Sequence, residues 1–280
     1  MNTPVATVGR LGDTSNRDYS RKLQLFNAMA APELRAAIAS LHLRDEMRVL
    51  DAGCGTGETL AWLAAAVAPG GLAVGADLSA NHLGAARAAR PDALLLQADL
   101  QKTPLAAASF DLVWSVNTVH HLRDPAAGVR ALAALLRVGG RLALGQSSLL
   151  PDLYFAWDAR LERVTTEAVR AYYRDRYCLS EQDLTAVRGL LGLLHAAGLS
   201  NITVRTFMIE RFAPLDPYAQ AWLLEAIFRG TWGERLRPYL SPADYLELIR
   251  LCDPQHPDFA LHRRDFHFLQ TFTLALGESP

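Results

Sequence analysis

Short apolar segments alternate with helical segments between residues 47 and 145. Each apolar segment is hydrophobic along nearly its whole length and ends at a glycine or polar turn. Strands buried on both faces have this composition, and their alternation with helices is typical of βαβ units in a parallel sheet. The predicted strands are 47–51, 71–77, 93–98, 110–116 and 141–145, and the predicted helices are 59–68, 80–90 and 125–138. The pattern therefore predicts a doubly wound α/β domain.

The regions on either side of this domain have different patterns. Residues 1–16 are polar and show no apolar period, so we expect a mobile arm. Apolar side chains then return every three or four positions over residues 17–40, which predicts one or two amphipathic helices broken near Pro32. After residue 147 we predict helical stretches at 152–176 and 214–251, a helix at 180–197, and strands at 202–207 and 267–276. Of the 23 aromatic residues, 18 follow residue 150; they form the core of a helical subdomain or line a substrate pocket, and both interpretations stay open.

The segment VLDAGCGTG, residues 49–57, leads from a strand through a glycine loop into a helix. Glycines allow a tight turn and a close approach of the backbone to a bound nucleoside. A dinucleotide fingerprint that begins at Gly53 and Gly55 needs a third glycine at position 58, where the sequence has Glu58. A pyrophosphate would meet that carboxylate at the start of the helix, so the loop argues against a dinucleotide. No Gly-Lys-Ser/Thr follows, which excludes a phosphate-binding loop of that type.

Two acidic residues end the next two strands. Asp77 follows the glycine loop by twenty residues, and its carboxylate can accept both hydrogen bonds of a ribose diol. An N-cap role is the alternative, but Ser79 suits that position better. Asp99 ends the third strand, where it can accept a hydrogen bond from an exocyclic adenine amino group while Leu100 packs against the ring.

Together these segments resemble the class I S-adenosylmethionine (SAM)-dependent methyltransferases. The resemblance rests on four motifs in order, VLDAGCGTGETL, VGADLS, LLLQADLQKTPLAAASFDLVWSVNTVHHLRDP and LLRVGGRLALGQSS. It covers about residues 47–148 and, more weakly, 180–207. The family implies a Rossmann-like sheet of seven strands, mostly parallel with the last strand antiparallel, and SAM as cofactor with S-adenosylhomocysteine (SAH) as product. The positions matched to its cofactor contacts are Asp51, Gly53, Cys54, Gly55, Gly57, Asp77, Leu78, Asp99 and Leu100.

The turn after the fourth strand, SVNTVHH at residues 115–121, is the place to look for substrate chemistry. His120 or His121 could act as a general base toward a phenol or acid, although a histidine at this turn can also be a packing element. Ser115 and Asn117 are further candidate cofactor contacts. Asn117 lacks the Pro-Pro-aromatic tail found in methyltransferases that modify amino groups of nucleic acids and glutamine. Tyr19 precedes the first strand and is either a lid contact over SAM or a staple for the N-terminal helix.

Charge and cysteine content exclude several classes of protein. The chain has 28 basic and 29 acidic side chains among 280 residues, so no overall positive charge attracts nucleic acid. It has no apolar run long enough to span a membrane and no secretory signal at its start, which predicts a cytoplasmic protein without a membrane partner. Three cysteines without ligand spacing indicate neither a disulfide framework nor a metal site.

We predict a SAM-dependent methyltransferase that acts on a small organic metabolite at an oxygen, nitrogen or carbon atom, in specialised biosynthesis. Alternatives are a methyltransferase directed at protein or RNA, and a SAM-binding scaffold that has lost methyl transfer. A further expectation is a homodimer. The expected division is an arm with lid helices at 1–40, a SAM-binding core at 41–148, a cap insertion at 149–178, a core helix and strand at 179–207, a helical cap at 208–263 and a closing strand at 264–280.

Overall fold

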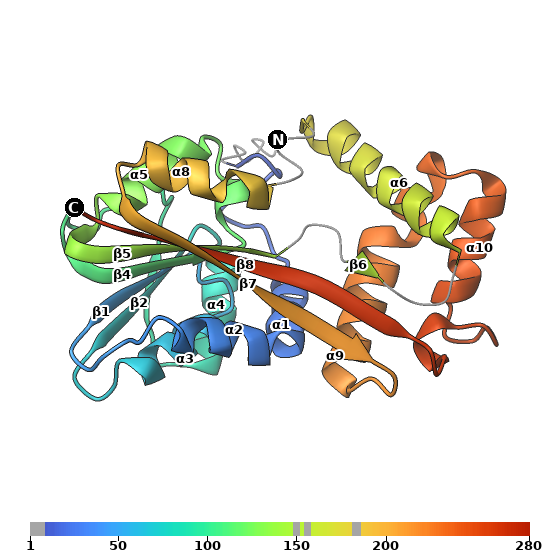
Figure 1. Ribbon diagram of the computed structural model, residues 1–280, viewed down its shortest axis with the longest axis horizontal. Coiled ribbons are helices and arrows are strands. Elements are labelled where there is room, and N and C mark those ends of the chain that lie inside the picture. The colour runs from blue at the N-terminus through green and yellow to red at the C-terminus, as the bar shows by residue number, and fades with distance from the viewer. Residues whose placement is uncertain (1–8, 148–151, 154–157, 181–185) are drawn as a thin grey trace, which may run out of the picture.

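The computed structural model describes residues 9–147, 152–153, 158–180 and 186–280, which form one mixed sheet covered by helices (Figure 1). The strands in these residues follow the order β3-β2-β1-β4-β5-β8, and β8 also pairs with β7 and with the short β6. Their bounds are β1 Arg48–Ala52, β2 Leu72–Asp77, β3 Leu94–Gln97, β4 Phe110–Val116, β5 Leu136–Ser147, β6 Asp152–Leu153, β7 Ser200–Phe212 and β8 His267–Glu278. The pairs from β3 to β5 are parallel, whereas β8 runs antiparallel to β5 and β7. The predicted seven-stranded sheet with an antiparallel last strand is confirmed, with the two-residue β6 added to it.

The central strands are apolar on both faces because helices cover both faces. In β1, Val49 belongs to the hydrophobic core on one side of the sheet and its neighbour Leu50 to the core on the other side. Figure 1 shows α1, α2 and α3 below the sheet and α5 and α8 above it. Their bounds are α1 Ser20–Met29, α2 Ala31–Ala39, α3 Glu58–Ala66, α5 Pro125–Ala133 and α8 Leu190–Ala196, while α4, Ala80–Ala89, packs against β2 and β3.

Most predicted boundaries agree with the structure, and the exceptions have tertiary causes. The break near Pro32 is confirmed, since proline lies in the first turn of α2. The predicted helix 125–138 ends at Ala133, because Leu136 already pairs with Phe110 as the first residue of β5. The predicted helix at 180–197 appears as a 3₁₀ turn, Ala186–Gly189, followed by α8, and residues 181–185 lie outside the described part.

Helices in the second half of the chain form a cap beyond the ends of β1, β2 and β4, and β7 and β8 run on beside it (Figure 1). They are α6 Ala159–Tyr177, α9 Pro217–Ala221, the π-helix η3 Trp222–Trp232, the 3₁₀-helix η4 Gly233–Tyr239 and α10 Pro242–Cys252. The predicted helix from residue 152 is wrong at its start, because Asp152 and Leu153 pair with β8 and α6 begins only after the Asp158 N-cap. Many aromatic side chains of the cap are core, as in the contact between Trp222 and Phe26 of α1, whose ring centres lie 5.3 Å apart.

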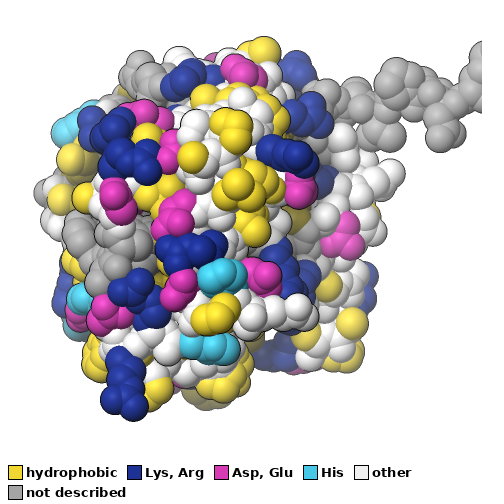
Figure 2. Space-filling model, turned by 90° about the vertical axis from the view of Figure 1, so that its right-hand side faces the viewer, with side chains coloured by type: hydrophobic (Ala, Val, Ile, Leu, Met, Phe, Trp, Pro, Cys, Tyr) yellow, Lys and Arg dark blue, Asp and Glu magenta, His cyan; other side chains and the backbone are white. Residues whose placement is uncertain are grey.

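The cap end of the molecule carries charges of both signs. On the face seen in Figure 2, basic and acidic side chains are interspersed around apolar ones. Ion pairs within the cap include Arg160 with Asp244 at 2.6 Å and Arg263 with Asp265 at 2.9 Å. No helix in the described ranges is both long and apolar enough to cross a membrane.

Residues 9–19, which we call the N-terminal strap, are packed against the rest of the chain. The prediction of a mobile arm is therefore wrong for residues 9–16, while residues 1–8 lie outside the described part. Leu11 is 8% exposed and forms a small apolar cluster with Leu179, against which Tyr173 and Tyr177 of the cap helix α6 pack. A single apolar anchor among polar residues gives no hydrophobic period, so the pattern of the sequence did not reveal it.

Candidate functional site

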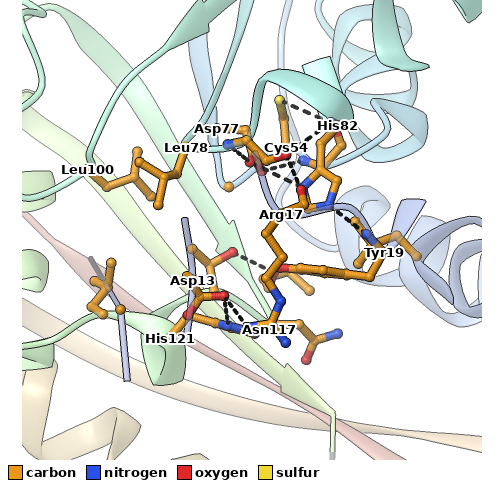
Figure 3. A pocket seen from close by; sticks show the side chains of 18 of the residues that line it. Asp13, Arg17, Tyr19, Cys54, Asp77, Leu78, His82, Leu100, Asn117 and His121 are labelled. Atoms are coloured by element: carbon orange, nitrogen blue, oxygen red, sulfur yellow. Dashed lines mark hydrogen bonds and ion pairs between the residues drawn. The ribbon is translucent and has the colours of Figure 1, made fainter. Parts of the chain in front are cut away.

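A cavity with about 1020 Å³ of empty space, partly open to solvent, lies where β1, β2 and β4 end (Figure 3). Its walls come from the turns that follow these strands, from α1 and from the N-terminal strap. The carboxyl ends of parallel strands are the usual ligand site of doubly wound sheets, because loops there diverge on either side of the sheet. The topology thus places the glycine loop and the acidic strand ends around one space.

The glycine loop has the close backbone approach that its sequence predicts. Gly53, Gly55 and Gly57 all adopt positive φ angles, of 87°, 52° and 88°. A side chain at Gly53 would overlap Thr118 after β4, and a Cβ at Gly55 would lie 2.9 Å from Leu23 of α1. The loop therefore tolerates only glycine at these two places, and its backbone borders the cavity directly.

Asp51 and Trp114 each have a buried polar atom that lacks a partner among the described residues, and both side chains line the cavity. Asp51 is 2% exposed, and its Oδ2 atom accepts no hydrogen bond. Burial, with a smaller effect of the nearby Asp77 and Glu58 charges, raises the pKa of Asp51 well above its ordinary value. The indole N–H of Trp114 is likewise buried without an acceptor. A buried polar group without a hydrogen bond costs stability, so an unpaired acceptor and an unpaired donor at one cavity indicate a polar ligand.

The Asp77 carboxylate organises the loops beside the cavity. Its Oδ2 accepts the Gly55 N–H at 2.9 Å, and its Oδ1 accepts the Ser79 N–H at 2.8 Å. His82 Nδ1 lies 3.3 Å from the same Oδ1, and His82 Nε2 accepts the Tyr19 N–H at 3.3 Å. Since Nε2 is the acceptor, Nδ1 carries the proton and donates to Asp77. Each carboxylate oxygen has two acceptor positions, so Asp77 Oδ2 keeps one for a ligand.

Glu58 occupies the position where a dinucleotide site needs glycine. Its Oε2 accepts hydrogen bonds from Thr56 Oγ1 at 2.6 Å and from Asn27 Nδ2 at 2.9 Å. The carboxylate is thus fixed at the N-terminus of α3, where a pyrophosphate would otherwise bind. Its negative charge disfavours a second anion there, which supports the prediction that the ligand is not a dinucleotide.

The N-terminal strap crosses the cavity from the end of β4 to the start of α4. At one end the Arg10 N–H donates to the His121 carbonyl at 2.9 Å. At the other, the Ala80 N–H donates to the Ser15 carbonyl at 2.8 Å, and the Ser79 hydroxyl donates to the strap carbonyl at residue 17. The strap therefore covers the space between the two strand ends.

The two candidate histidines have different environments. His121 lines the cavity, and its Nδ1 lies 3.1 Å from Oδ1 of Asp13 in the strap. His120 does not line the described cavity, and its Nδ1 lies 2.9 Å from Oε1 of Gln146. Burial and the adjacent His121 lower the pKa of His120 well below its ordinary value, so His120 is neutral at physiological pH. The cavity thus receives only the second histidine of the pair.

Comparison with known proteins shows to which family the chain belongs. A family model described as "Methyltransferase domain" matches residues 50–144. The chain is 35% identical to a malonyl-[acyl-carrier protein] O-methyltransferase from Laribacter hongkongensis, over 86% of this chain and 96% of that protein. The chain belongs to the class I SAM-dependent methyltransferases.

Two further comparisons agree with this assignment. The methyltransferase is 38% identical over 118 residues to the 27-O-demethylrifamycin SV methyltransferase of Amycolatopsis mediterranei, over 40% of this chain and 43% of that one. Its chain spans about half of the length of the curated relatives that it matches over the core, between 36% and 54% in three of them. The crystal structure of the YcgJ protein from Bacillus subtilis has the same fold, with a TM-score of 0.57, 16% identity, and coverage of 89% of this chain and 98% of that one.

SAM, the cofactor of this family, fits the residues that line the cavity. The methionine part of SAM carries an ammonium and a carboxylate, and the adenosine part carries a ribose diol. The unpaired carboxylate oxygen of Asp51 can accept from the ammonium, and the unpaired Trp114 N–H can donate to the carboxylate. The side chain of Asp77, 13% exposed at the cavity, has the remaining acceptor position that a ribose hydroxyl requires.

Most predicted site residues lie around this one cavity. Those in its lining are Tyr19, Asp51, Gly53, Cys54, Gly55, Asp77, Leu78, Asp99, Leu100, Asn117 and His121. Gly57 and Ser115 lie outside the described lining. Gly57 is the N-cap of α3, and the Ser115 hydroxyl donates to the Ala52 carbonyl at 2.9 Å, which ties β4 to β1.

Sequence analysis missed several lining residues of this methyltransferase. Asp13 and Arg17 come from the strap, His82 from the first turn of α4, and Trp114 from the interior of β4. Trp114 lies inside a largely apolar strand, so the sequence pattern predicts a core residue at this position. Asp13 and Arg17 are four residues apart and form an ion pair of 3.1 Å, but this spacing occurs in a polar stretch without other signals.

Proposed function

We propose that the methyltransferase transfers the methyl group of SAM to a small organic metabolite in a biosynthetic pathway. The observation that carries the proposal is the strap-covered cavity, in which the unpaired Asp51 carboxylate and Trp114 indole N–H face one space. A cavity that the strap partly covers limits the access of water and suits an acceptor small enough to enter it.

Each part of the cofactor has candidate partners in this arrangement. Asp51 and the glycine loop would hold the methionine part, and Asp77 the ribose. Leu78 and Leu100 would enclose the adenine ring, with Asp99 at its amino group. The Asp99 Oδ1 accepts the Gln101 N–H at 2.9 Å, which fixes the carboxylate at the rim of the cavity.

When bound, SAM supplies a methyl group on a good leaving group, so the chain need not provide a nucleophile. The protein's task is to hold the acceptor in line with that group, and correct positioning alone supplies much of the rate. An acceptor hydroxyl or protonated amine must also lose a proton. We assign this role to His121, which lines the cavity. His120 does not line the described cavity, and its Nδ1 is hydrogen-bonded to Gln146.

The names of the relatives support a small acceptor in biosynthesis. They include methyltransferases of malonyl-[acyl-carrier protein], of demethylrifamycin and of tocopherol. These acceptors differ in size and in the atom that is methylated, so we propose the class of acceptor and leave the atom open. Free cysteines at positions 54, 178 and 252 fit a reducing compartment such as the cytoplasm. A homodimer and the absence of nucleic-acid and membrane partners stay predictions.

A methylation screen tests this function. The purified protein is incubated with methyl-labelled SAM and panels of phenols, carboxylic acids, acyl thioesters and amines, and the products are analysed by mass spectrometry. We expect one added methyl group on a member of a small-molecule panel and an equal amount of SAH. Label found only in added protein or RNA would favour the macromolecular alternative. Tight binding of SAM without methyl transfer to any panel would contradict the proposed reaction.

A further inference from the structure

Asp13 is a buried carboxylate outside the part of the chain that the family model matches. It lies in the strap, outside the matched residues 50–144, with 11% of its side chain exposed. Its Oδ1 lies 3.1 Å from His121 Nδ1 and 3.1 Å from Arg17 Nη1. Figure 3 shows these three side chains converging at one end of the cavity. The strap thus places the Asp13 carboxylate next to Nδ1 of His121, the candidate base.

The ionisation of Asp13 determines the direction of this hydrogen bond. Burial raises the pKa of Asp13, whereas the hydrogen bond from His121 and the Arg17 charge lower it, and overall the pKa lies below its ordinary value. Asp13 is therefore ionised at neutral pH and can only accept. Neutral His121 must then carry its proton on Nδ1, which leaves Nε2 as the nitrogen with a free lone pair.

The local packing holds the pair in this orientation. Gly9 contacts both partners so closely that a side chain there would overlap Asp13 Oδ2 and the His121 carbonyl. The ring of Tyr19 stacks parallel to the His121 ring, with centres 6.2 Å apart and an interplanar angle of 7°. The Arg10 N–H fixes the His121 backbone. Three strap residues, Gly9, Arg10 and Tyr19, therefore hold the Asp13 carboxylate and the His121 ring in place.

We propose that Asp13 is a positioning residue for methyl transfer, which holds His121 in the Nδ1–H tautomer so that Nε2 accepts the proton of the methyl acceptor. The proposal rests on the proposed function for its chemistry, while the tautomer itself does not depend on it. A carboxylate behind a histidine fixes both the ring orientation and the tautomer, and it stabilises the imidazolium that forms.

The proton step balances with methyl transfer. The acceptor's oxygen or nitrogen gains the methyl group and gives its proton to His121 Nε2, while the electron pair of the broken carbon–sulfur bond stays on sulfur. The positive charge that the sulfonium loses then resides on the His121 imidazolium, between Asp13 and the cavity. Solvent removes the proton after product release. The neutral His120, whose ring centre lies 4.2 Å from that of His121, adds no competing positive charge.

Nitrogen NMR of the imidazole rings tests the proposal without any acceptor. The spectra are recorded on ¹⁵N-labelled protein, free and saturated with SAH, and His121 is assigned from its absence in His121→Gln. We expect a protonated Nδ1 and an unprotonated Nε2 in the wild type, and a mixture of tautomers in Asp13→Asn. Asp18→Asn is the matched control, since the exposed Asp18 carboxylate bonds Ser20 and does not line the cavity. Its spectrum should equal that of the wild type.

Turnover gives the second measurement, once the screen has provided an acceptor. Asp13→Asn should lower kcat by about a hundredfold, as expected for a misplaced general base, and leave SAH affinity within twofold. Gly9→Ala should give a smaller fall by displacing the same carboxylate. A wild-type His121 with its proton on Nε2, or an unchanged tautomer in Asp13→Asn, would overturn the proposal even if Asp13→Asn were inactive. Failure to bind SAH would contradict the proposed function. The His121 tautomer, measured in the protein without SAH, would then still test whether Asp13 positions His121.

Discussion

At the scale of single residues, unsatisfied polar atoms mark the functional end of the molecule. Oδ2 of Asp13, Oδ2 of Asp51 and Nε1 of Trp114 are all buried without a partner among the described residues, and all three side chains line one cavity. Such atoms destabilise a fold unless a ligand satisfies them. Three such atoms around one cavity are what a site for a polar ligand would present.

The substitution Asp51→Asn should separate binding from stability. Loss of a charged acceptor for the SAM ammonium is expected to weaken SAM binding by about 1.5 to 3 kcal/mol, or more than tenfold, in calorimetric titration. The pKa of Asp51 is raised in the folded chain, so the free protein loses stability as pH rises from the unfolded pKa toward the folded one. The asparagine variant lacks this loss and should melt at a higher temperature at neutral pH.

A matched control for this variant is Asp92→Asn, because the exposed Asp92 pairs with Arg90 far from the cavity lining. It should change neither SAM affinity nor the pH dependence of the melting temperature. An Asp51→Asn protein that binds SAM as tightly as the wild type would show that the ammonium lies elsewhere.

Residues that end predicted strands were accessible from the sequence, whereas those in the strap were not. Asp51, Asp77 and Asp99 each follow an apolar run, and the parallel topology brings such positions to one edge. Asp13 reaches the same edge through carbonyl and side-chain contacts that have no sequence period. Its role depends on tertiary hydrogen bonds, which a one-dimensional pattern does not encode.

At the scale of elements, the strap is the part of the fold that departs most from its sequence pattern. The central strands and helices follow from periodicity, because sheet and helix burial repeat along the chain. The strap is held by its ends at His121 and Ala80 and by Leu11, which packs near Leu179, Tyr173 and Tyr177. This cluster joins the strap to the cap, so the cap and the cavity cover are mechanically connected.

Leu11→Ala should loosen the strap without unfolding the core. Removing a buried leucine side chain costs about 2 kcal/mol or more, and here the loss falls on the small cluster that fastens the strap. We expect SAH to dissociate about tenfold faster in stopped-flow measurements, with a small change in melting temperature. Asn16→Ala, on the exposed part of the strap, is the control and should keep the wild-type rate. Equal dissociation rates in Leu11→Ala and wild type would mean that the strap does not retain the ligand.

At the scale of the whole molecule, a methyltransferase core meets a helical cap along the ends of its strands (Figure 1). The sequence predicted the core and its order of motifs because each βα unit repeats a recognisable pattern. It also predicted cap insertions, whose bounds stay a prediction, and a helix from residue 152, which is wrong at its start because Asp152 and Leu153 pair with β8. Long-range strand pairing of this kind depends on the position of β8, more than a hundred residues later in the chain.

The central claim is that the cavity binds SAM and SAH, and calorimetric titration with SAM, SAH and NAD in parallel tests it most directly. The account predicts micromolar binding of both adenosyl compounds at one site per chain. It predicts no binding of NAD, because Glu58 holds a negative charge at the N-terminus of α3. Binding of NAD, or absence of binding by SAM and SAH, would contradict the account.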